Sequence, residues 1–409
     1  MSEIKIDPTR LIDSLERMGR IGKRPDTDGI TRLSLSKENK KARDILVKWM
    51  IEEGLKVKID PIGNIFGIRA GKKPELPIIA SGSHLDTVRN AGIYDGALGV
   101  LSALEVIRIL NESETQTIHP LALACFTNEE GARFQPDMMG SAVFSAVLGV
   151  EEAFSRRDDN GISVKEALED INYKGQDFVH IGKFIELHVE QGPFLYENGL
   201  DIGVVEGVQG IAWWNGEYIG EANHAGTTPI QYRKDSLLAC SELCCGLRNL
   251  AETHGENSVS TMGRIGVEPD IINVIPEKTR FTIDFRQYDG TVFHSGKKKV
   301  EELVRKIANK YGLGYSLNLV ANIKPVQFDP SMVDLVEIEA NKLGLSNVRM
   351  PSGAGHDAGL LSHNYPTSMI FVPSVEGRSH SPEEMTRDKD IENGANLLLN
   401  CILTLSQTC

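Results

Sequence analysis

Histidine and carboxylate side chains recur in this sequence at positions where strands are expected to end. His84 is followed by Asp95 in a glycine-containing loop, and His188 and His380 come later in the chain. Imidazole and carboxylate groups are suitable ligands for zinc and related divalent ions. Asp86, two residues after His84, could orient that imidazole by accepting its free N–H in a hydrogen bond. Each of these residues alone is more often an ordinary loop or core residue.

Two adjacent carboxylates, Glu129 and Glu130, directly follow an apolar segment. Such a pair is costly near a protein interior unless a cation or a proton compensates it. One solution is a metal ligand beside a general base, which takes a proton from a water whose pKa the metal lowers. A solvated helix N-terminus explains the dipeptide equally well. The combination favours a site for two ions about 3.5–4 Å apart, bridged by a shared carboxylate. The candidate ligands are His84, Asp95, one carboxylate of the glutamate pair, His188 and His380.

An α/β framework is expected to position these residues. Apolar strands are predicted at 76–80, 121–126 and 184–188, with a helix at 97–110 between the first two. Each strand delivers polar residues at its C-terminal end, where open α/β sheets place their sites. At the start of the chain, Asp7-Pro8 predicts a helix N-cap and first helical position, and a second helix is expected between Ser36 and Gly54.

The middle of the chain has a different pattern and is expected to form a compact α+β insert. The predicted domains are a first catalytic part at 1–210, the insert at 211–325 and a second catalytic part at 326–409. Within the insert, strands are predicted at 213–219, 259–265, 280–286 and 316–320, and helices at 235–254 and 300–310.

Charge and composition restrict the partners. The net charge of −13 argues against a nucleic-acid partner, which would require a basic face, and against an anionic membrane surface. No apolar run reaches the roughly 18 residues of a membrane span, and the charged start lacks the apolar segment of a signal peptide. The six cysteines form no CxxC pair. A cytoplasmic protein without membrane or nucleic-acid partners is expected.

Short segments along nearly the whole chain resemble the M20 metallopeptidase clan. They are, in order, HLDTV, DGALGVL, FTNEEGARF, ELHVEQGP, NHAGTTP, SGAGHDA and SHSP. They look most like the amidase branch: N-carbamoyl-L-amino-acid hydrolases, β-ureidopropionases and allantoate or ureidoglycolate amidohydrolases. Peptidases of the clan often have an acid where this chain has His188, and the HxEQG form is typical of the amidase branch.

The resemblance implies a fold and a dinuclear centre. The fold is α/β: a central mixed sheet flanked by helices carries the metals, and the insert is a lid and dimerisation domain. His84 and His188 each bind one metal, Asp95 bridges, and Glu130 and His380 complete the second metal. The implied cofactors are two divalent ions, zinc or manganese, with cobalt and nickel as alternatives.

The resemblance also assigns the catalytic and substrate-binding groups. Glu129 is the general acid/base. His224 of the lid polarises the scissile carbonyl, and in the clan this histidine often comes from the partner subunit. Asn273 and Arg286 hold the substrate carboxylate, to which a guanidinium suits a bidentate contact; whether these three residues act in cis or in trans stays open. Gln191, Gly355 and His356 match the residues that form the family's pocket for the carbamoyl group and the substrate backbone. His356 could instead have a purely structural role.

The expected reaction converts an N-carbamoyl-L-amino acid to the L-amino acid, carbon dioxide and ammonia. Ile211 follows Gly210 where allantoate amidohydrolases usually carry a polar residue, and segment 132–140 also looks carbamoylase-like. The alternatives are an allantoate or ureidoglycolate amidohydrolase and a β-ureidopropionase. A dipeptidase predicts an acid instead of His188. A non-catalytic ureide-binding protein would have lost a ligand or Glu129, and neither is lost.

Overall fold

The computed structural model describes residues 4–407 and divides the chain into two compact units. The two ends of the chain build a larger unit, and Val208–Val326 forms a smaller one. The sequence placed this insert at 211–325. The first three residues of the charged start and Cys409 lie outside the described part. Within that part, no helix combines the length and apolarity needed to cross a membrane.

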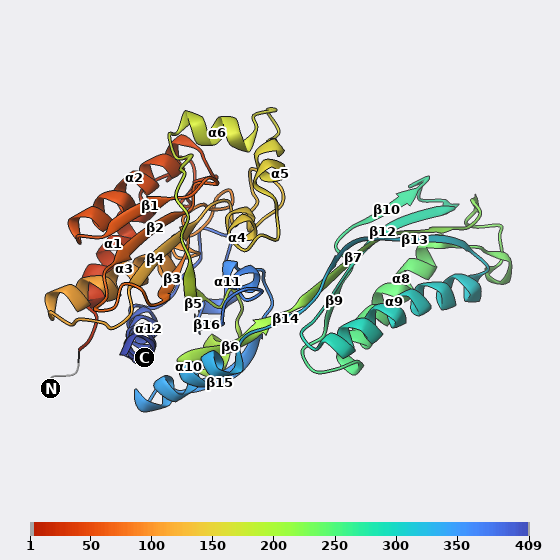
Figure 1. The fold of residues 1–409 in the computed structure, drawn as a ribbon. Coiled ribbons are helices and arrows are strands. Elements are labelled where there is room, and N and C mark those ends of the chain that lie inside the picture. Colours follow the sequence, from red (N-terminus) through yellow and green to blue (C-terminus); the bar gives the residue numbers. More distant parts are fainter. Residues whose placement is uncertain (1–3, 408–409) are drawn as a thin grey trace. The chain divides into compact units, whose positions relative to one another are not determined.

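A nine-stranded mixed sheet forms the centre of the larger unit (Figure 1). The strands follow one another in the order β1 (Lys56–Ile59), β2 (Ile65–Arg69), β4 (Leu121–Phe126), β3 (Ile78–His84), β5 (Ile181–Val189), β16 (Thr367–Val372), β6 (Ile202–Val208) and β14 (Val326–Gln327), and β15 (Asn347–Ser352) also pairs with β6. The run β4-β3-β5-β16 is parallel, whereas β1–β2, β2–β4 and β16–β6 are antiparallel. The predicted mixed α/β sheet is therefore confirmed.

Helices cover both faces of this sheet. On one face lie α3 (Ala97–Glu112) and α12 (Asp388–Gln407), where Gly99 and Gly394 both approach Leu187 closely. α1 (Pro8–Gly19) packs on these two helices. α11 (Asp357–Leu361) packs on the opposite face and contacts α4 (Met139–Phe144). The remaining helices of this unit are α2 (Lys37–Glu52), α5 (Val150–Ser155), α6 (Val164–Asp170), α7 (Phe194–Asn198) and α10 (Pro330–Lys342).

The first two helices begin where their caps predict. The Asp7 side chain accepts a hydrogen bond from the Arg10 N–H, and the Ser36 side chain accepts one from the Asn39 N–H. These bonds satisfy N–H groups that the first helical turn leaves without a partner. Gly54 follows α2 with φ +72°, a conformation that glycine adopts at little cost.

The smaller unit is a five-stranded antiparallel sheet with two helices on one face (Figure 1). Its strands are β7 (Gly210–Ile219), β9 (Val259–Thr261), β10 (Ile265–Glu268), β12 (Lys278–Gln287) and β13 (Gly314–Ile323), its helices are α8 (Ser236–Thr253) and α9 (Gly290–Tyr311), and β8 (Asn223–His224) pairs with β11 (Val274–Ile275) in a small second sheet. Trp214, Phe281 and Phe285 lie in the core between the five-stranded sheet and the helices. The other face of this sheet carries no helix of the unit.

Two predicted elements of the insert differ from the structure. The strand expected at 259–265 is two strands, β9 and β10, because the segment between them contains Gly263, and glycine weakens a strand. The helix expected at 300–310 begins ten residues earlier, at Gly290. It starts there because the Asp289 side chain accepts hydrogen bonds from the N–H groups of Thr291 and Val292.

Candidate metal centre

The parallel run β4-β3-β5-β16 brings the carboxyl ends of four strands to one edge of the sheet. β3 ends at His84, and β5 carries His188 next to its last residue. Glu129 and Glu130 follow β4, and the segment after β16 leads to His380. Strand ends far apart in the sequence thus supply groups to a common site.

Asp95 lies between two buried imidazoles. Its Oδ1 is 3.4 Å from Nε2 of His84 and 3.3 Å from Nε2 of His188. The Nδ1 atoms of these rings lie 2.9 Å from the backbone carbonyl oxygens of Asp86 and Val189 respectively. With the Nδ1–H donated to a carbonyl, each ring directs the lone pair of Nε2 towards the carboxylate.

The other oxygen of Asp95 belongs to a second group of ligating atoms. Oδ2 of Asp95 is 3.3 Å from Nε2 of His380, which in turn lies 3.4 Å from Oε2 of Glu130. The ligating atoms of each group lie within 4.8 Å of one another. Asp95 therefore presents one oxygen to each group, the arrangement that a bridging carboxylate requires.

The spacing of these atoms fits divalent ions. Tetrahedral ligands about 2.0–2.1 Å from an ion are roughly 3.3–3.4 Å apart. The four distances around Asp95 and His380 are all 3.3 or 3.4 Å. Nε2 of His84 is buried without a hydrogen-bond partner. The residues present are thus compatible with a metal at each group.

The charges of the site also require compensation. Burial raises the pKa of Glu129 well above its usual range and that of Glu130 to about 8. Although burial opposes it, the adjacent imidazoles of His188, His380 and His84 hold the pKa of Asp95 well below its usual range. Three carboxylates in so confined a site are stable as anions only beside positive charge, which metal ions supply.

Glu129 lies at the edge of the first group and borders a small cavity. Its Oε2 is 3.4 Å from Nε2 of His84, and the residue is 8% exposed. The cavity measures about 140 Å³, and ligating residues of both groups line it together with Gln191, Gly355 and His356. A carboxylate beside the ligand atoms and open to a cavity is suitably placed to exchange protons with a molecule bound there.

The Asp86 side chain does not have the expected partner. Its two carboxylate oxygens accept hydrogen bonds from the N–H groups of Glu129 and Glu130, both at 3.3 Å. The His84 ring instead contacts the main-chain carbonyl of Asp86. Asp86 thus contacts the imidazole as expected, but through its main-chain oxygen and not through its carboxylate. The Asp86 carboxylate instead fixes the backbone of the glutamate pair.

Gln191 and His356 both carry a buried polar atom without a hydrogen-bond partner, Oε1 and Nε2 respectively. Nε2 of Gln191 donates to Oδ2 of Asp95 at 2.8 Å. The His356 ring packs 4.6 Å from that of His188, and burial lowers its pKa well below the usual range, which keeps it neutral. Both side chains can therefore offer a polar atom to a ligand in the cavity.

Glu384 is a residue of the site that the sequence did not reveal. It is 6% exposed, and its Oε1 accepts hydrogen bonds from the N–H groups of Tyr94 and Asp95 at 2.8 and 3.1 Å. Its Oε2 accepts one from the Ser379 hydroxyl at 2.9 Å, and that hydroxyl is also 3.2 Å from Oδ2 of Asp95. Glu384 thus connects the Asp95 loop with the segment that carries His380. In the sequence, the only indication that Glu384 belongs to the site was its position four residues after His380.

Glu186 was also missed. It is fully buried on β5, where it precedes His188 by two residues and so points to the same face. The Ser83 hydroxyl donates to its Oε1 at 2.6 Å, and the Ala358 N–H donates to its Oε2 at 2.9 Å. Glu186 therefore connects β3, β5 and α11 beneath the site. A carboxylate within an apolar strand, two residues from a candidate ligand, was a signal for it.

His224 and Asn273 lie together in the smaller unit. They belong to the β8–β11 sheet, in which the Ala225 N–H donates to the Asn273 carbonyl at 2.9 Å. Nδ1 of His224 accepts hydrogen bonds from the N–H groups of Gly226 and Thr227 at 2.9 and 3.2 Å. Since Nδ1 is the acceptor, the proton of the neutral ring is on Nε2, which makes His224 a hydrogen-bond donor without a positive charge.

Arg286 lies on β12 of the same unit and pairs with a residue of its own strand. Its Nη2 is 2.9 Å from Oδ2 of Asp284, and its Nε is 3.1 Å from the same oxygen. The two side chains stand two residues apart on one face of the sheet. A ligand carboxylate at Arg286 would therefore share the guanidinium with Asp284.

Comparison with known proteins relates the whole chain to hydrolases. The model of peptidase family M20/M25/M40 matches residues 80–404. An N-carbamoyl-L-amino acid amidohydrolase of Geobacillus stearothermophilus is 35% identical over 98% of this chain and 99% of its own. An allantoate amidohydrolase of Bacillus subtilis (strain 168) is 33% identical over 97% of each chain. The crystal structure of a hydantoinase/carbamoylase family amidase from Burkholderia multivorans matches with a TM-score of 0.97 and 39% identity over 99% of both chains.

Proposed function

This chain belongs to peptidase family M20/M25/M40, and from that membership we propose that it is a metal-dependent hydrolase of linear amide bonds whose substrate is an N-carbamoyl-L-amino acid. One observation carries the proposal. Asp95 presents an oxygen to each of two groups of ligating atoms, and Glu129 lies beside them at a cavity. This is the arrangement expected of a hydrolytic site that binds two ions.

The metals would be held by the two groups described above. His84 and His188 would bind one ion and Glu130 and His380 the other, with Asp95 shared. Zinc and manganese suit imidazole and carboxylate ligands, as do cobalt and nickel. Divalent ions bound there would polarise the scissile carbonyl and lower the pKa of a water molecule.

Glu129 performs the proton transfers in the proposed reaction. As a carboxylate it takes a proton from the attacking water, whose oxygen adds to the ureido carbon. It then gives that proton to the leaving nitrogen as the C–N bond breaks. The products are the free L-amino acid and carbamic acid, which decomposes to carbon dioxide and ammonia. The hydrogen bonds from Glu129 and Glu130 to Asp86 keep the base in position.

The smaller unit would supply the groups that recognise the rest of the substrate. His224 donates its Nε2–H to the carbonyl oxygen as negative charge develops there. Asn273 and Arg286 bind the substrate carboxylate. In the larger unit, Gln191 and His356 offer their unpaired atoms to the carbamoyl group. The smaller unit thus acts as a lid, and we propose that it also forms a homodimer.

The choice among ureido substrates rests on Ile211, the second residue of β7. Ile211 is apolar, which favours an amino-acid derivative over the more polar allantoate. Ureide hydrolysis is the second candidate, because an allantoate amidohydrolase matches the chain over nearly its full length. β-Ureidopropionate hydrolysis and ureide binding without catalysis are the remaining alternatives.

A substrate panel tests the proposal. Protein reconstituted with zinc or manganese is given N-carbamoyl-L-methionine, N-carbamoyl-β-alanine, allantoate and ureidoglycolate, and released ammonia is measured. The first compound should react fastest. Glu129→Gln should lower kcat by about 10²–10⁴-fold with unchanged metal content, whereas Glu383→Gln, at an exposed neighbouring segment, should have no effect. Full activity of Glu129→Gln would exclude the assigned base.

Mixed dimers test the origin of the lid histidine. An inactive Glu129→Gln protein and an inactive His224→Ala protein are co-expressed with different tags, and the heterodimer is isolated. If His224 acts on the partner's site, one site of the heterodimer has both residues and activity returns. Heterodimers that remain inactive show that His224 acts within its own chain.

A further inference from the structure

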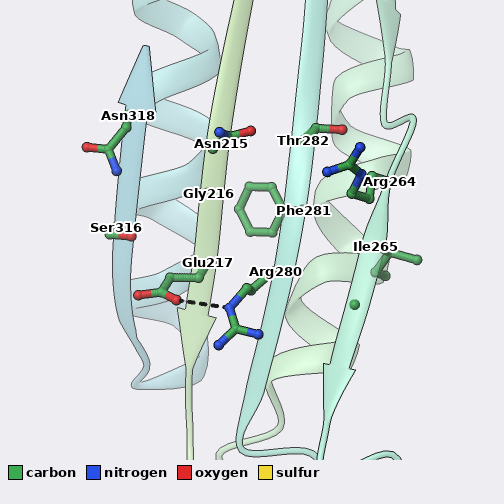
Figure 2. Close-up of a pocket in the computed structure, with 11 residues that line it drawn as sticks. Asn215, Gly216, Glu217, Arg264, Ile265, Arg280, Phe281, Thr282, Ser316 and Asn318 are labelled. Atoms are coloured by element: carbon green, nitrogen blue, oxygen red, sulfur yellow. Dashed lines mark ion pairs between the residues drawn. The ribbon is translucent and has the colours of Figure 1, made fainter. Parts of the chain in front are cut away.

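The open face of the smaller unit's sheet is polar at one end. Register places Arg280 opposite Glu217 and Thr282 opposite Asn215, and directly paired residues of an antiparallel sheet share a face. Figure 2 shows these side chains beside a pocket of about 500 Å³. On β13, Ser316 pairs with Glu217 and Asn318 pairs with Asn215, so both also lie on this face. The side chains that β7, β12 and β13 pair on the open face at this end are therefore polar, although Ile265 and Phe281 also line the pocket.

The other end of the same face has apolar side chains around the ion pair of Arg286 and Asp284. Register places Val259 and Ile211 on the two sides of Arg286, and Ile323 beyond Ile211. Trp213 is the next residue of β7 on this face, and it is 44% exposed; Val259 and Ile323 are 49% and 51% exposed. These four side chains and Arg286 are called the Arg286 patch below.

A β-bulge in β13 helps to make this end apolar. The pairing of β13 with β7 shifts between Leu319 and Ala321, so that Val320 is skipped. Because successive side chains of a strand alternate between faces, the extra residue brings Ala321 and Ile323 to the open face in place of Val320 and Asn322, so that Ile323 pairs with Ile211. Bulges are frequent beside binding sites, where they redirect side chains in this way.

The chemistry of the Arg286 patch specifies its ligand. Arg286 is paired with Asp284, which lies opposite Trp213 in register. A guanidinium among exposed apolar side chains suits a small molecule in which a carboxylate and a large apolar group are attached to the same atom. An α-amino acid derivative has this form, because its side chain and carboxylate share one carbon.

We propose that the Arg286 patch binds the apolar side chain of the substrate next to its carboxylate, so that N-carbamoyl derivatives of large aliphatic and aromatic L-amino acids are preferred over N-carbamoylglycine. Trp213 is the specificity-determining residue, because it has the largest apolar side chain of the patch. The inference rests on the proposed function, which assigns the substrate carboxylate to Arg286. Burial of one large apolar side chain corresponds to about a ten- to hundredfold change in kcat/KM.

Substrate selectivity provides the first test. Trp213→Ala should lower kcat/KM for N-carbamoyl-L-phenylalanine at least about tenfold and that for N-carbamoylglycine by less than about twofold. Trp213→Phe should retain most of the preference. Tyr315→Ala is the matched control, because Tyr315 is 42% exposed on the same sheet but pairs with the core residue Tyr218 and so faces the helices. Equal losses for both substrates, or no loss for either, overturn the proposal.

Fluorescence provides a test that does not depend on turnover. Of the three tryptophans, Trp49 and Trp214 are 5% and 1% exposed, so that solvent-dependent emission comes from Trp213. Adding N-carbamoyl-L-methionine to metal-loaded Glu129→Gln protein should shift the emission to shorter wavelength, and Trp213→Phe should remove this shift. An unchanged spectrum at saturating ligand overturns the inference.

The outcomes separate this inference from the proposed function. Failure of the wild-type protein to hydrolyse any N-carbamoyl amino acid rejects the function, whereas hydrolysis of all of them at equal rates rejects only the selectivity. Light scattering identifies the remaining possibility. If Trp213→Ala changes the molar mass in solution but not the substrate preference, the Arg286 patch is a contact between copies of this chain, and the inference is wrong.

Discussion

Replacing Glu384 with alanine should destabilise the loop that carries Asp95 and weaken metal binding. The Glu384 carboxylate accepts hydrogen bonds from the N–H groups of Tyr94 and Asp95 and from the Ser379 hydroxyl. Tyr94 and Asp95 belong to the loop of the candidate ligand Asp95, and Ser379 directly precedes the candidate ligand His380. Alanine cannot replace these acceptors, and a side chain that is 6% exposed leaves little access for water.

The expected magnitude follows from the lost hydrogen bonds. A buried donor left without a partner costs about 1–3 kcal/mol, and the Ser379 hydroxyl can still donate to Asp95. The two N–H groups therefore predict a loss of about 2–6 kcal/mol in the free energy of unfolding. Glu384→Gln keeps one carboxamide oxygen for both N–H groups, so its loss should be about 1 kcal/mol or less.

Urea denaturation of the metal-free variants at pH 8 measures the loss in stability, and calorimetric titration with zinc or manganese measures metal affinity. Burial raises the pKa of Glu384 to about 7, so the side chain is mainly ionised at pH 8. Glu383→Ala is the control, because Glu383 is exposed in the same segment. The reasoning is refuted if Glu384→Ala loses no more stability than Glu383→Ala, or if Glu384→Gln loses as much as Glu384→Ala.

Three further predictions concern other parts of the chain. Gly96→Ala should reduce the amount of bound metal, because a Cβ at φ +65° would lie 2.4–2.5 Å from ring atoms of His84. Elemental analysis measures the metal content. The control Gly161→Ala, at φ +79° in open space, should leave it unchanged. Burial raises the pKa of Asp60 to about 7, above its unfolded value near 4, so the folded state binds more protons between these pH values. The free energy of unfolding should therefore fall by up to about 1.4 kcal/mol per pH unit as pH rises through this window, and Asp60→Asn should flatten that slope in urea titrations. Nitrogen-15 NMR at pH 8 should find His224 protonated at Nε2, and an Nδ1-protonated ring would contradict the two hydrogen bonds that Nδ1 accepts.

The sequence predicted strands β3, β4 and β5 but not their order, and β3 ends four residues later than expected, at His84. Apolar runs located β3, β4 and β5, because strands buried on both faces are continuously hydrophobic. Their neighbours in the sheet are determined by long-range pairing, which no local pattern contains. The order β4-β3-β5-β16 brings His84, Glu129 and His188 to one edge. Candidate ligands could therefore be named from the sequence, whereas their grouping around Asp95 required the structure.

Loop residues of the site were less predictable. Asp86 contacts the His84 ring as expected, but the contact is made by its main-chain oxygen, and its carboxylate binds the backbone of the glutamate pair instead. Glu383 and Glu384 are adjacent and chemically identical, yet one is exposed and the other buried. The path of the backbone decides between them, and a loop without periodicity gives no sequence signal for its path.

The distribution of charge between the two units supports a role for each of them in the proposed reaction. Among the residues that line the cavity of the larger unit, carboxylates and imidazoles predominate, and none of the residues described there is lysine or arginine. Metal ions can balance those carboxylates, but a substrate carboxylate in addition requires a cation of its own. The smaller unit carries Arg286 within an apolar face, together with a histidine that donates a hydrogen bond while neutral. The proposed substrate, which has a ureido group and a carboxylate on one carbon, would use both sets of groups, whereas a neutral amide would leave Arg286 without a ligand.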